Sequence, residues 1–335
     1  MVRTGANAYV RYGFESAYKA SVGSPTNSFG LKTAVTGWTL TTNRTALAKL
    51  GQVEVDTFAY GQQQGSLSLG FVLGDTTSHK LFQAIYGTGT DGTPSTTQIY
   101  GGTTARSTTN NLIGNTLAVE IAANLETANS VRTLRGGILN TLSISASVGD
   151  VVNATADITY GKEDAPSTSF SAGNAPTEDS KPFTFAHGTV NLRTASGTEV
   201  IAELQEADIN WTQNSDLLYT LGDNQAATAI KRVLEITGRF RASWKDNNKV
   251  NALINQMKTG GAVTHKETWG DAYAGGGSDI EFKLTFATGD GKSITIELAG
   301  MSFMDHAVSG MEPVEPLFEE LNWQAKFCKV TAVPA

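Results

Sequence analysis

The residues of this 335-residue chain that could take part in chemistry are scattered along it. The segment Gly87–Gly92 reads Gly-Thr-Gly-Thr-Asp-Gly and matches the GxGxxG pattern of dinucleotide-binding loops. It follows an apolar segment of helical spacing instead of a strand, and no helix opens after it, so the geometry that holds a phosphate is missing. A loop is therefore favoured, and the sequence predicts no nucleotide cofactor.

The candidates for metal ligands and for catalytic groups are isolated as well. No histidine has a second His or Cys at ligand spacing; the four are His79, His187, His265 and His306. The adjacent carboxylates Glu319 and Glu320 should point to opposite faces of a strand, so they cannot form an acid–base pair by themselves. The only cysteine, Cys328, is expected to pack as a small apolar side chain. We expect no enzyme, no metal site and no cofactor.

Composition narrows the remaining classes. The net charge is −7 and only 17% of residues are charged, which argues against a protein that grips nucleic acid with a basic surface. One cysteine excludes a disulfide framework and predicts folding in the cytoplasm. The N-terminus shows no signal peptide, and no apolar run approaches the roughly 18 residues of a membrane-spanning helix. We expect no membrane insertion.

The clearest pattern in the chain is a hairpin over residues 136–160. Even-numbered positions are apolar from Leu142 to Val148 and again from Val152 to Tyr160, while the odd positions are small and polar. Period-two alternation predicts two strands with one buried and one wet face. The shared phase predicts that Val148 lies opposite Val152, across a three-residue loop. Because an isolated hairpin is marginal in water, a second layer must cover the apolar face.

Similar alternation predicts strands elsewhere in the chain. They are centred on residues 36–40, 65–73, 117–121, 207–211, 234–244, 280–286, 294–298 and 321–327. Asp75 or Thr76 is expected to cap a short helix that ends at Gly87, and a second helix is expected near residues 247–259. Residues 87–111 are rich in Gly and Thr and are predicted to form one long loop.

The two halves of the chain show the same order of features. A Trp strand, an Asn, a Leu-Gly segment, a strand, a helix, a strand and a Gly-led hairpin recur, with WTLTTNRTALAKLG aligned to WTQNSDLLYTLG. The predicted fold is mainly β, with two tandem β-sandwich or half-barrel domains that each carry one short flanking helix and close into a ring by oligomerisation. The expected parts are an N-terminal arm (1–35), a first domain (36–164), a linker (165–182) and a second domain (183–335).

Three stretches of the sequence resemble a known family. These are residues 117–163, from LAVEIAANLETANSVRTLRGG to NATADITYGKE, then ELQEADINWTQNSDLLYTLG at 203–222, and residues 233–250. They are similar to the tail tube (major tail) proteins of long-tailed phages and related tailed viruses. The resemblance implies a structural virion protein made in the host cytoplasm, whose rings stack into the tube that conducts DNA to the host. Members with a doubled fold imply a trimer that imitates a six-fold ring; a hexamer is the alternative.

The tube interpretation assigns roles to two groups of residues. A polar face with few carboxylates suits a lumen through which DNA slides without adhering, and the residues expected there are Ser143, Ser145, Ser147, Asn153, Thr155, Asp157, Glu320, Asn322 and Gln324. Leu-rich segments in polar loops are expected to contact the next ring, because exposed Leu clusters mark interfaces. That group is Asn43, Leu47, Leu50, Gly51, Asn214, Leu217, Leu218, Tyr219, Leu221 and Gly222.

The resemblance also implies tape-measure and tail terminator or tip proteins as partners, and transient, non-specific passage of DNA. The alternatives are a capsid or decoration protein, another β-sandwich virion protein and a secretion-system tube protein, which share composition or fold. A carbohydrate-binding sandwich would expose aromatic residues on one sheet face, yet Trp38, Trp211, Trp244 and Trp323 stand in the phase of the core. A hydrolase would need a catalytic constellation that the sequence does not show.

Overall fold

The computed structural model describes most of the chain. The described residues are 9–22, 25–47, 50, 55, 57–59, 61–87, 90–91, 97–102, 116–122, 131–165, 179–193, 199–201, 204–243, 281–309 and 318–334. Strands dominate, as the alternation predicted, and one short α-helix accompanies them in this part of the chain. None of the helices within it is long and apolar enough to cross a membrane.

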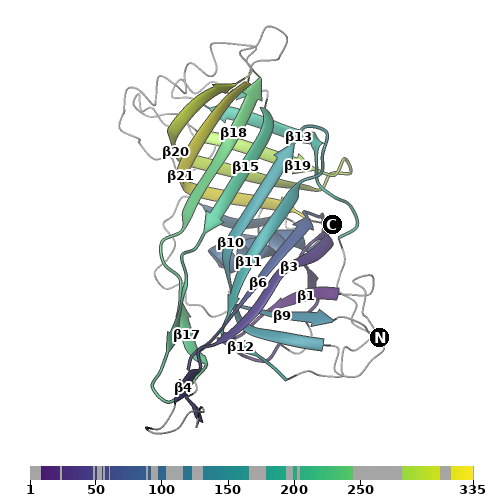
Figure 1. The fold of residues 1–335 in the computed structure, drawn as a ribbon. Coiled ribbons are helices and arrows are strands. Elements are labelled where there is room, and N and C mark those ends of the chain that lie inside the picture. The colour runs from purple at the N-terminus through teal and green to yellow at the C-terminus, as the bar shows by residue number, and fades with distance from the viewer. Residues whose placement is uncertain are drawn as a thin grey trace.

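One large antiparallel sheet runs through both halves of the molecule (Figure 1). Its eight strands follow one another in the order β3 (Leu31–Thr42), β6 (Gln63–Val72), β11 (Asn153–Tyr160), β10 (Val131–Ser147), β15 (Leu204–Thr212), β18 (Glu235–Ser243), β21 (Phe318–Val333) and β20 (Ser293–Ser309). Pairing of β10 with β15 joins the strands of the first half to those of the second. We call this sheet the long sheet.

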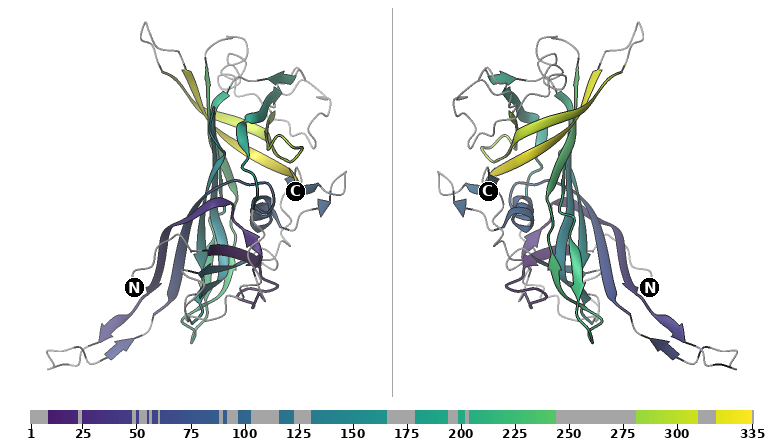
Figure 2. Two further views of the ribbon diagram at one scale, coloured as in Figure 1. Left: turned by 90° about the vertical axis from the view of Figure 1, so that its right-hand side faces the viewer. Right: turned by 90° about the vertical axis from the view of Figure 1, so that its left-hand side faces the viewer.

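A second layer covers one side of the long sheet, as the edge-on views of Figure 2 show. In the first half it consists of β12 (Lys162–Glu163), the first part of β10, β9 (Leu117–Ala122), β1 (Tyr9–Phe14) and β2 (Asn27–Ser28). In the second half it consists of β8 (Gln98–Gly102), the last part of β21, the first part of β20, β19 (Glu281–Ala287), β13 (Thr184–Arg193) and β14 (Glu199–Ile201). Strands β10, β20 and β21 therefore belong to both layers.

The long strands turn from one layer into the other at two glycines. Gly136 in β10 has φ = 65° and Gly300 in β20 has φ = 63°, a left-handed backbone that favours glycine. Four residues after each glycine the strand pairing is irregular: it skips Asn140 in β10 and Met304 in β20. Such bulges bend a strand and raise its twist, so both long strands can serve two sheets.

The hairpin at residues 136–160 forms with the predicted faces but with a different register. Ile144 lies opposite Ala154 and Ser145 opposite Asn153, so the predicted pair of Val148 with Val152 is wrong by two residues. The strands end earlier because other segments bind the turn: the Val152 N–H donates to the carbonyl of Phe183, and the Val148 N–H donates to that of Gln205, both at 2.9 Å. Val148 is 54% exposed as a result.

Helix α1 (Leu81–Tyr86) follows a 3₁₀ turn at Ser78–Lys80 and ends at Gly87, as predicted, but its cap differs. The carboxylate of Asp179 accepts the backbone N–H groups of Thr76 and Thr77 at 2.6 and 2.7 Å. Asp75 faces the other way and accepts hydrogen bonds from Ser180 and Lys181. Residues 179–182, expected in a linker, therefore pack against the entry of α1; residues 166–178 lie outside the described part.

Two further expectations need correction. The predicted loop at 87–111 contains strands β7 (Thr90–Asp91) and β8, and β8 pairs with the C-terminal part of β21. Trp38 stands on the core face, but it lies in edge strand β3 and is 37% exposed, whereas Trp211 and Trp323 are fully buried. The second predicted helix, at 247–259, and Trp244 lie outside the described residues.

Two strand pairs project at one end of the long sheet (Figures 1 and 2). The first arm pairs β4 (Thr45–Leu47) with β5 (Thr57–Ala59), and the second pairs β16 (Asp216–Tyr219) with β17 (Ala226–Ile230). Each arm is an extension of the connection between two adjacent strands of the long sheet, from β3 to β6 in the first arm and from β15 to β18 in the second. Both connections lie at the same end of the sheet, so both arms project there.

Candidate functional site

All nine residues expected to line a lumen lie on one face of the long sheet. Lateral pairing places Asn322, Arg239, Asp208, Ser145 and Asn153 in one row across five strands. A neighbouring row holds Gln324, Thr237, Asn210, Ser143 and Thr155. The structure thus brings together residues from both halves, which the sequence had assigned separately. We call this surface the polar face.

Burial on the opposite side fixes the orientation of the polar face. Ile144, Ile209 and Trp323 alternate with the polar residues along their strands, and none is more than 1% exposed. A slip of one residue in any of these strands would turn its apolar side chains toward water, so the register is strongly held. The polar side chains are therefore presented together on the uncovered face.

In the first half of the polar face, hydroxyl groups hold the carboxylate of Asp157. Asp157 accepts hydrogen bonds from Ser68 at 2.5 Å and from Thr141 at 2.6 Å. Each hydroxyl comes from a neighbouring strand, β6 or β10, directly opposite Asp157. This part of the face presents hydroxyls and amides with a single negative charge.

The second half of the polar face carries a network of charges. Arg239 donates to Asp208 at 2.9 Å and to Glu206 at 3.4 Å, and Arg241 donates to Glu206 at 3.2 Å. Glu320 lies within 4.0 Å of both guanidinium groups. The hydrogen bond to Asp208, with the nearby carboxylates, raises the pKa of Arg239 further. Three carboxylates thus surround two fixed positive charges, which leaves the network with a net negative charge.

Sequence reasoning missed four members of this network: Glu206, Asp208, Arg239 and Arg241. Their alternation with buried residues was visible, but only the pairing of β10 with β15 puts Asp208 and Glu206 beside Ser145 and Ser147, with Arg239 and Arg241 on the next strand, β18. The available signal was the shared period of two, which assigned each residue to a wet face. The alternation could not show that the polar faces of the two halves form one surface.

The structure offers little support for chemistry at other places. Among the described residues, no group of three or more His, Cys, Asp or Glu side chains is arranged to hold a metal ion. Cys328 is buried, and burial raises the pKa of its thiol to about 12, so it stays protonated and unreactive. Burial lowers the pKa of His79 to about 4, which keeps that imidazole neutral inside the core.

The residues expected to contact the next ring lie on the two arms, with Gly51 outside the described part. Leu50 and Leu221 are fully exposed, and Leu47 and Leu218 are 47% and 40% exposed. The arms start side by side: the Tyr219 hydroxyl donates to the carbonyl of Gln63, and the Gln63 N–H donates to that of Asn224, both at 2.7 Å. Asn43, Asn214 and Gly222 are exposed, while Leu217 and Tyr219 are half-buried.

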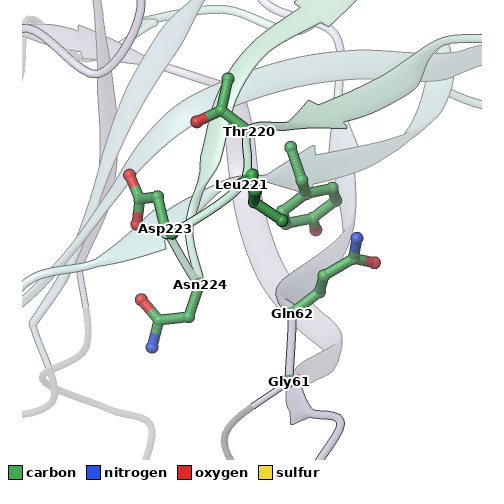
Figure 3. A pocket seen from close by; sticks show the side chains of 8 residues that line it. Gly61, Gln62, Thr220, Leu221, Asp223 and Asn224 are labelled. Atoms are coloured by element: carbon green, nitrogen blue, oxygen red, sulfur yellow. The ribbon is translucent and has the colours of Figure 1, made fainter.

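A groove of about 720 Å³ lies at the bases of the two arms (Figure 3). Gly61 and Gln62 line it from the first arm, and residues 219–224 line it from the second. Figure 3 shows Gln62 and Leu221 among the residues that line this groove. Exposed leucines next to such a groove give this end of the molecule an apolar surface.

A comparison with protein families decides between the classes left open. The family model described as phage tail tube protein matches residues 5–325, nearly the whole chain. The chain belongs to the phage tail tube family. A comparison with curated proteins found no match. Family membership makes the protein a structural component of the virion tail that assembles into stacked rings, and it does not favour the capsid, decoration or secretion-system alternatives.

Proposed function

We propose that this tail tube protein forms a three-chain ring whose inner wall is the polar face, and that DNA passes along this wall during delivery to the host. The observation that carries the proposal is the continuity of the face across both halves of the chain. It assigns lumen-lining roles to Ser143, Ser145, Ser147, Asn153, Thr155, Asp157, Glu320, Asn322 and Gln324, and adds Glu206, Asp208, Arg239 and Arg241.

The charges of the polar face suit passage without binding. A protein binds DNA tightly when its free cations displace the counterions of the phosphates. Here Arg239 and Arg241 are already paired with carboxylates, so they offer little to a phosphate. The remaining wall presents hydroxyls and amides with a small excess of negative charge, which repels DNA mildly.

The strand count supports a trimer over a hexamer. Each chain contributes the eight strands of its long sheet, so three copies give a wall of 24 strands. With strands about 4.8 Å apart and tilted by about 40°, the circumference is roughly 150 Å and the backbone diameter roughly 48 Å. Side chains reduce the opening to about 38 Å, which admits one duplex. Six copies would double the backbone diameter. The chain would then act as two tandem tube domains, 36–164 and 183–335, that give three copies pseudo-six-fold symmetry.

The arms would join one ring to the next. Both arms project from the same end of the sheet and expose Leu47, Leu50, Leu218 and Leu221, which would be buried against the neighbouring ring. Partners at the tube ends and inside it would be terminator or tip proteins and a tape-measure protein. The protein would be made in the host cytoplasm and would have no enzymatic role or membrane insertion.

The lumen assignment is tested by adding positive charge to the polar face. The variant Ser143→Lys/Asn153→Lys should still form tubes under the electron microscope, but these tubes should retain duplex DNA at low salt, and virions that carry them should deliver DNA poorly. The matched control is Ser16→Lys/Thr189→Lys, which adds the same charge at two exposed positions away from the polar face, in the bend after β1 and in β13. Normal delivery and no DNA retention by the Ser143/Asn153 variant would refute the assignment, as would equal effects of both variants.

A further inference from the structure

Both legs of the second arm are attached to one atom of helix α1, the carbonyl oxygen of Ala84. Gln213, on the leg that leads from β15 into the arm, donates a side-chain N–H to this oxygen at 3.2 Å. Lys231, on the leg that follows β17, donates its ammonium group to the same oxygen. The two donors lie on either side of the arm in sequence, so a single point of the helix holds both ends of the arm.

The C-terminal turn of α1 is suited to this attachment. The last four carbonyl groups of an α-helix have no partner within the helix, and Ala84 belongs to the last turn of α1. A lysine near such carbonyls interacts favourably with the oxygen and with the negative end of the helix dipole. The neighbouring Gln83 carbonyl accepts the N–H of Gly87 at 2.9 Å, whereas the Ala84 carbonyl accepts the donors from the arm.

Aromatic contacts hold the base of the second arm against the same helix. The indole N–H of Trp211 donates to the hydroxyl of Tyr86 at 2.8 Å. The indole ring also meets the ring of Phe82 edge-on, with 5.3 Å between the centroids. Trp211 is fully buried and lies two residues before Gln213, which is buried as well. The second arm therefore starts from a closely packed part of the core.

Helix α1 is anchored at its other end too, and the first arm depends on the second. The carboxylate of Asp179 accepts the N–H groups at the entry of α1, so the helix is held at both ends. Gln63, at the base of the first arm, is hydrogen-bonded to Tyr219 and to Asn224 of the second arm, both at 2.7 Å. A displacement of the second arm would therefore move the base of the first arm as well.

We propose that Lys231 and Gln213 are positioning residues for ring stacking: through Ala84 they hold both arms in the direction that contact with the next ring requires. Gln213 is buried and the ammonium group of Lys231 is bound to the chain's own helix, so both act from within the chain. The exposed leucines of the arms supply the contact surface, and α1 sets its direction. This inference rests on the proposed role of the arms in joining one ring to the next.

Removal of the ammonium group tests the attachment. Lys231→Met keeps most of the length of the side chain but loses a hydrogen bond from a charged donor, so the population of chains with a displaced arm should rise about tenfold or more. Spin labels at Ala227→Cys in the second arm and Thr155→Cys in β11 should then give a broader distribution of distances. Both positions are exposed, and the natural Cys328 is buried and escapes labelling.

The same variant should change assembly. Labelled chains are mixed with an excess of unlabelled chains, so that each ring holds at most one labelled copy. Electron microscopy of Lys231→Met should show single rings and short tubes in place of long tubes. Its melting temperature should stay within a few degrees of that of the unchanged protein, because the core contacts of α1 remain.

Arg232→Met is the matched control. Arg232 is the next residue on the same leg and carries the same charge, but its side chain is 65% exposed and pairs with Asp216 on the other leg. An exposed ion pair contributes little, so distances and tubes should be unchanged in this control. Gln213→Met removes the donor on the other leg at similar side-chain size, and it should act as Lys231→Met does.

Three results would overturn the proposal: an unchanged distance distribution in Lys231→Met and Gln213→Met, equal broadening in Arg232→Met, or loosened arms in tubes of normal length. Leu218→Asp/Leu221→Asp separates the last result from a failure of the proposed function. Long tubes of this variant would refute the role of the arms in stacking. Single rings would keep that role and exclude only the positioning by α1.

Discussion

The carboxylate of Asp179 should stabilise the protein far more than its place at the end of a predicted linker suggests. It is 4% exposed and accepts four hydrogen bonds: from the N–H groups of Thr76 and Thr77 and from the hydroxyls of Thr77 and Ser78, at 2.6 to 3.4 Å. The change Asp179→Ala removes the acceptor of two backbone donors, the buried N–H of Thr77 and the partly buried N–H of Thr76. A hydrogen bond to a charged group contributes about 1.5–3 kcal/mol, so the loss is about 3–6 kcal/mol.

Removal of a buried charge offsets part of this cost, which places the expected loss in the free energy of unfolding near 3 kcal/mol. Urea unfolding followed by circular dichroism measures it. Hydrogen exchange gives a local readout, because the amides of Thr76 and Thr77 should lose protection first. Asp179→Asn keeps an acceptor oxygen and should cost about half as much.

Asp150→Ala is the matched control. Asp150 also accepts a backbone N–H, from Val151 at 2.7 Å, but it lies in an exposed turn, so its removal should cost less than about 1 kcal/mol. If Asp179→Ala costs no more than Asp150→Ala, or leaves exchange at Thr76 and Thr77 unchanged, the capping role is refuted.

A buried histidine, a closely packed glycine and the charge network of the polar face can each be tested by substitution. Burial lowers the pKa of His79 to about 4, so the unfolded protein binds a proton at this histidine at a higher pH than the folded protein does. The free energy of unfolding should therefore be highest above about pH 6.5 and fall by about 3 kcal/mol towards pH 4. His79→Phe should remove this pH dependence, which urea titrations at several pH values measure. Gly238→Ala would place a methyl group 2.1 Å from the Asp208 carbonyl oxygen and should lower the free energy of unfolding by at least about 3 kcal/mol. In Gly37→Ala the nearest neighbour of the new methyl group is 3.6 Å away, so the loss should be under about 1 kcal/mol. Similar melting temperatures for the two variants would contradict the close contact at Gly238. Glu206→Gln/Asp208→Asn/Glu320→Gln should free Arg239 and Arg241, so that assembled tubes bind duplex DNA with a salt slope steeper by about 1.8 for each chain that contacts the DNA. Sedimentation with DNA at several salt concentrations tests this prediction. An unchanged slope would mean that the two guanidinium groups do not face the DNA.

The faces of the strands could be predicted from sequence because alternation encodes them directly. Leu142, Ile144, Ala154 and Ala156 are all buried, as their phase required. The register of the hairpin could not, because it depends on Phe183 and Gln205, whose backbone carbonyls take the N–H groups of the turn. The alternation of residue types along a strand carries no information about hydrogen-bond partners from distant segments.

The same limit applies to the candidate site and to the cap of α1. Ser145 and Asp208 are 63 residues apart, and the hydrogen bond between them, at 2.6 Å, exists only because β10 pairs with β15. Asp75 was predicted to cap the helix, but it accepts hydrogen bonds from residues near 180, and Asp179, about a hundred residues later, accepts the N–H groups at the helix entry. Sequence identified residue types suited to the polar face; tertiary pairing decided which of them meet.

The pairing of β10 with β15 within one chain also bears on how a ring would come together and come apart. Strands on one polypeptide meet at an effective concentration set by their connection, far above the concentration of free chains in solution. Half of the joints in a three-chain ring would thus be made during folding and would persist at any dilution. Only the other three would depend on encounters between molecules, so a diluted tube should release whole chains and never separate halves.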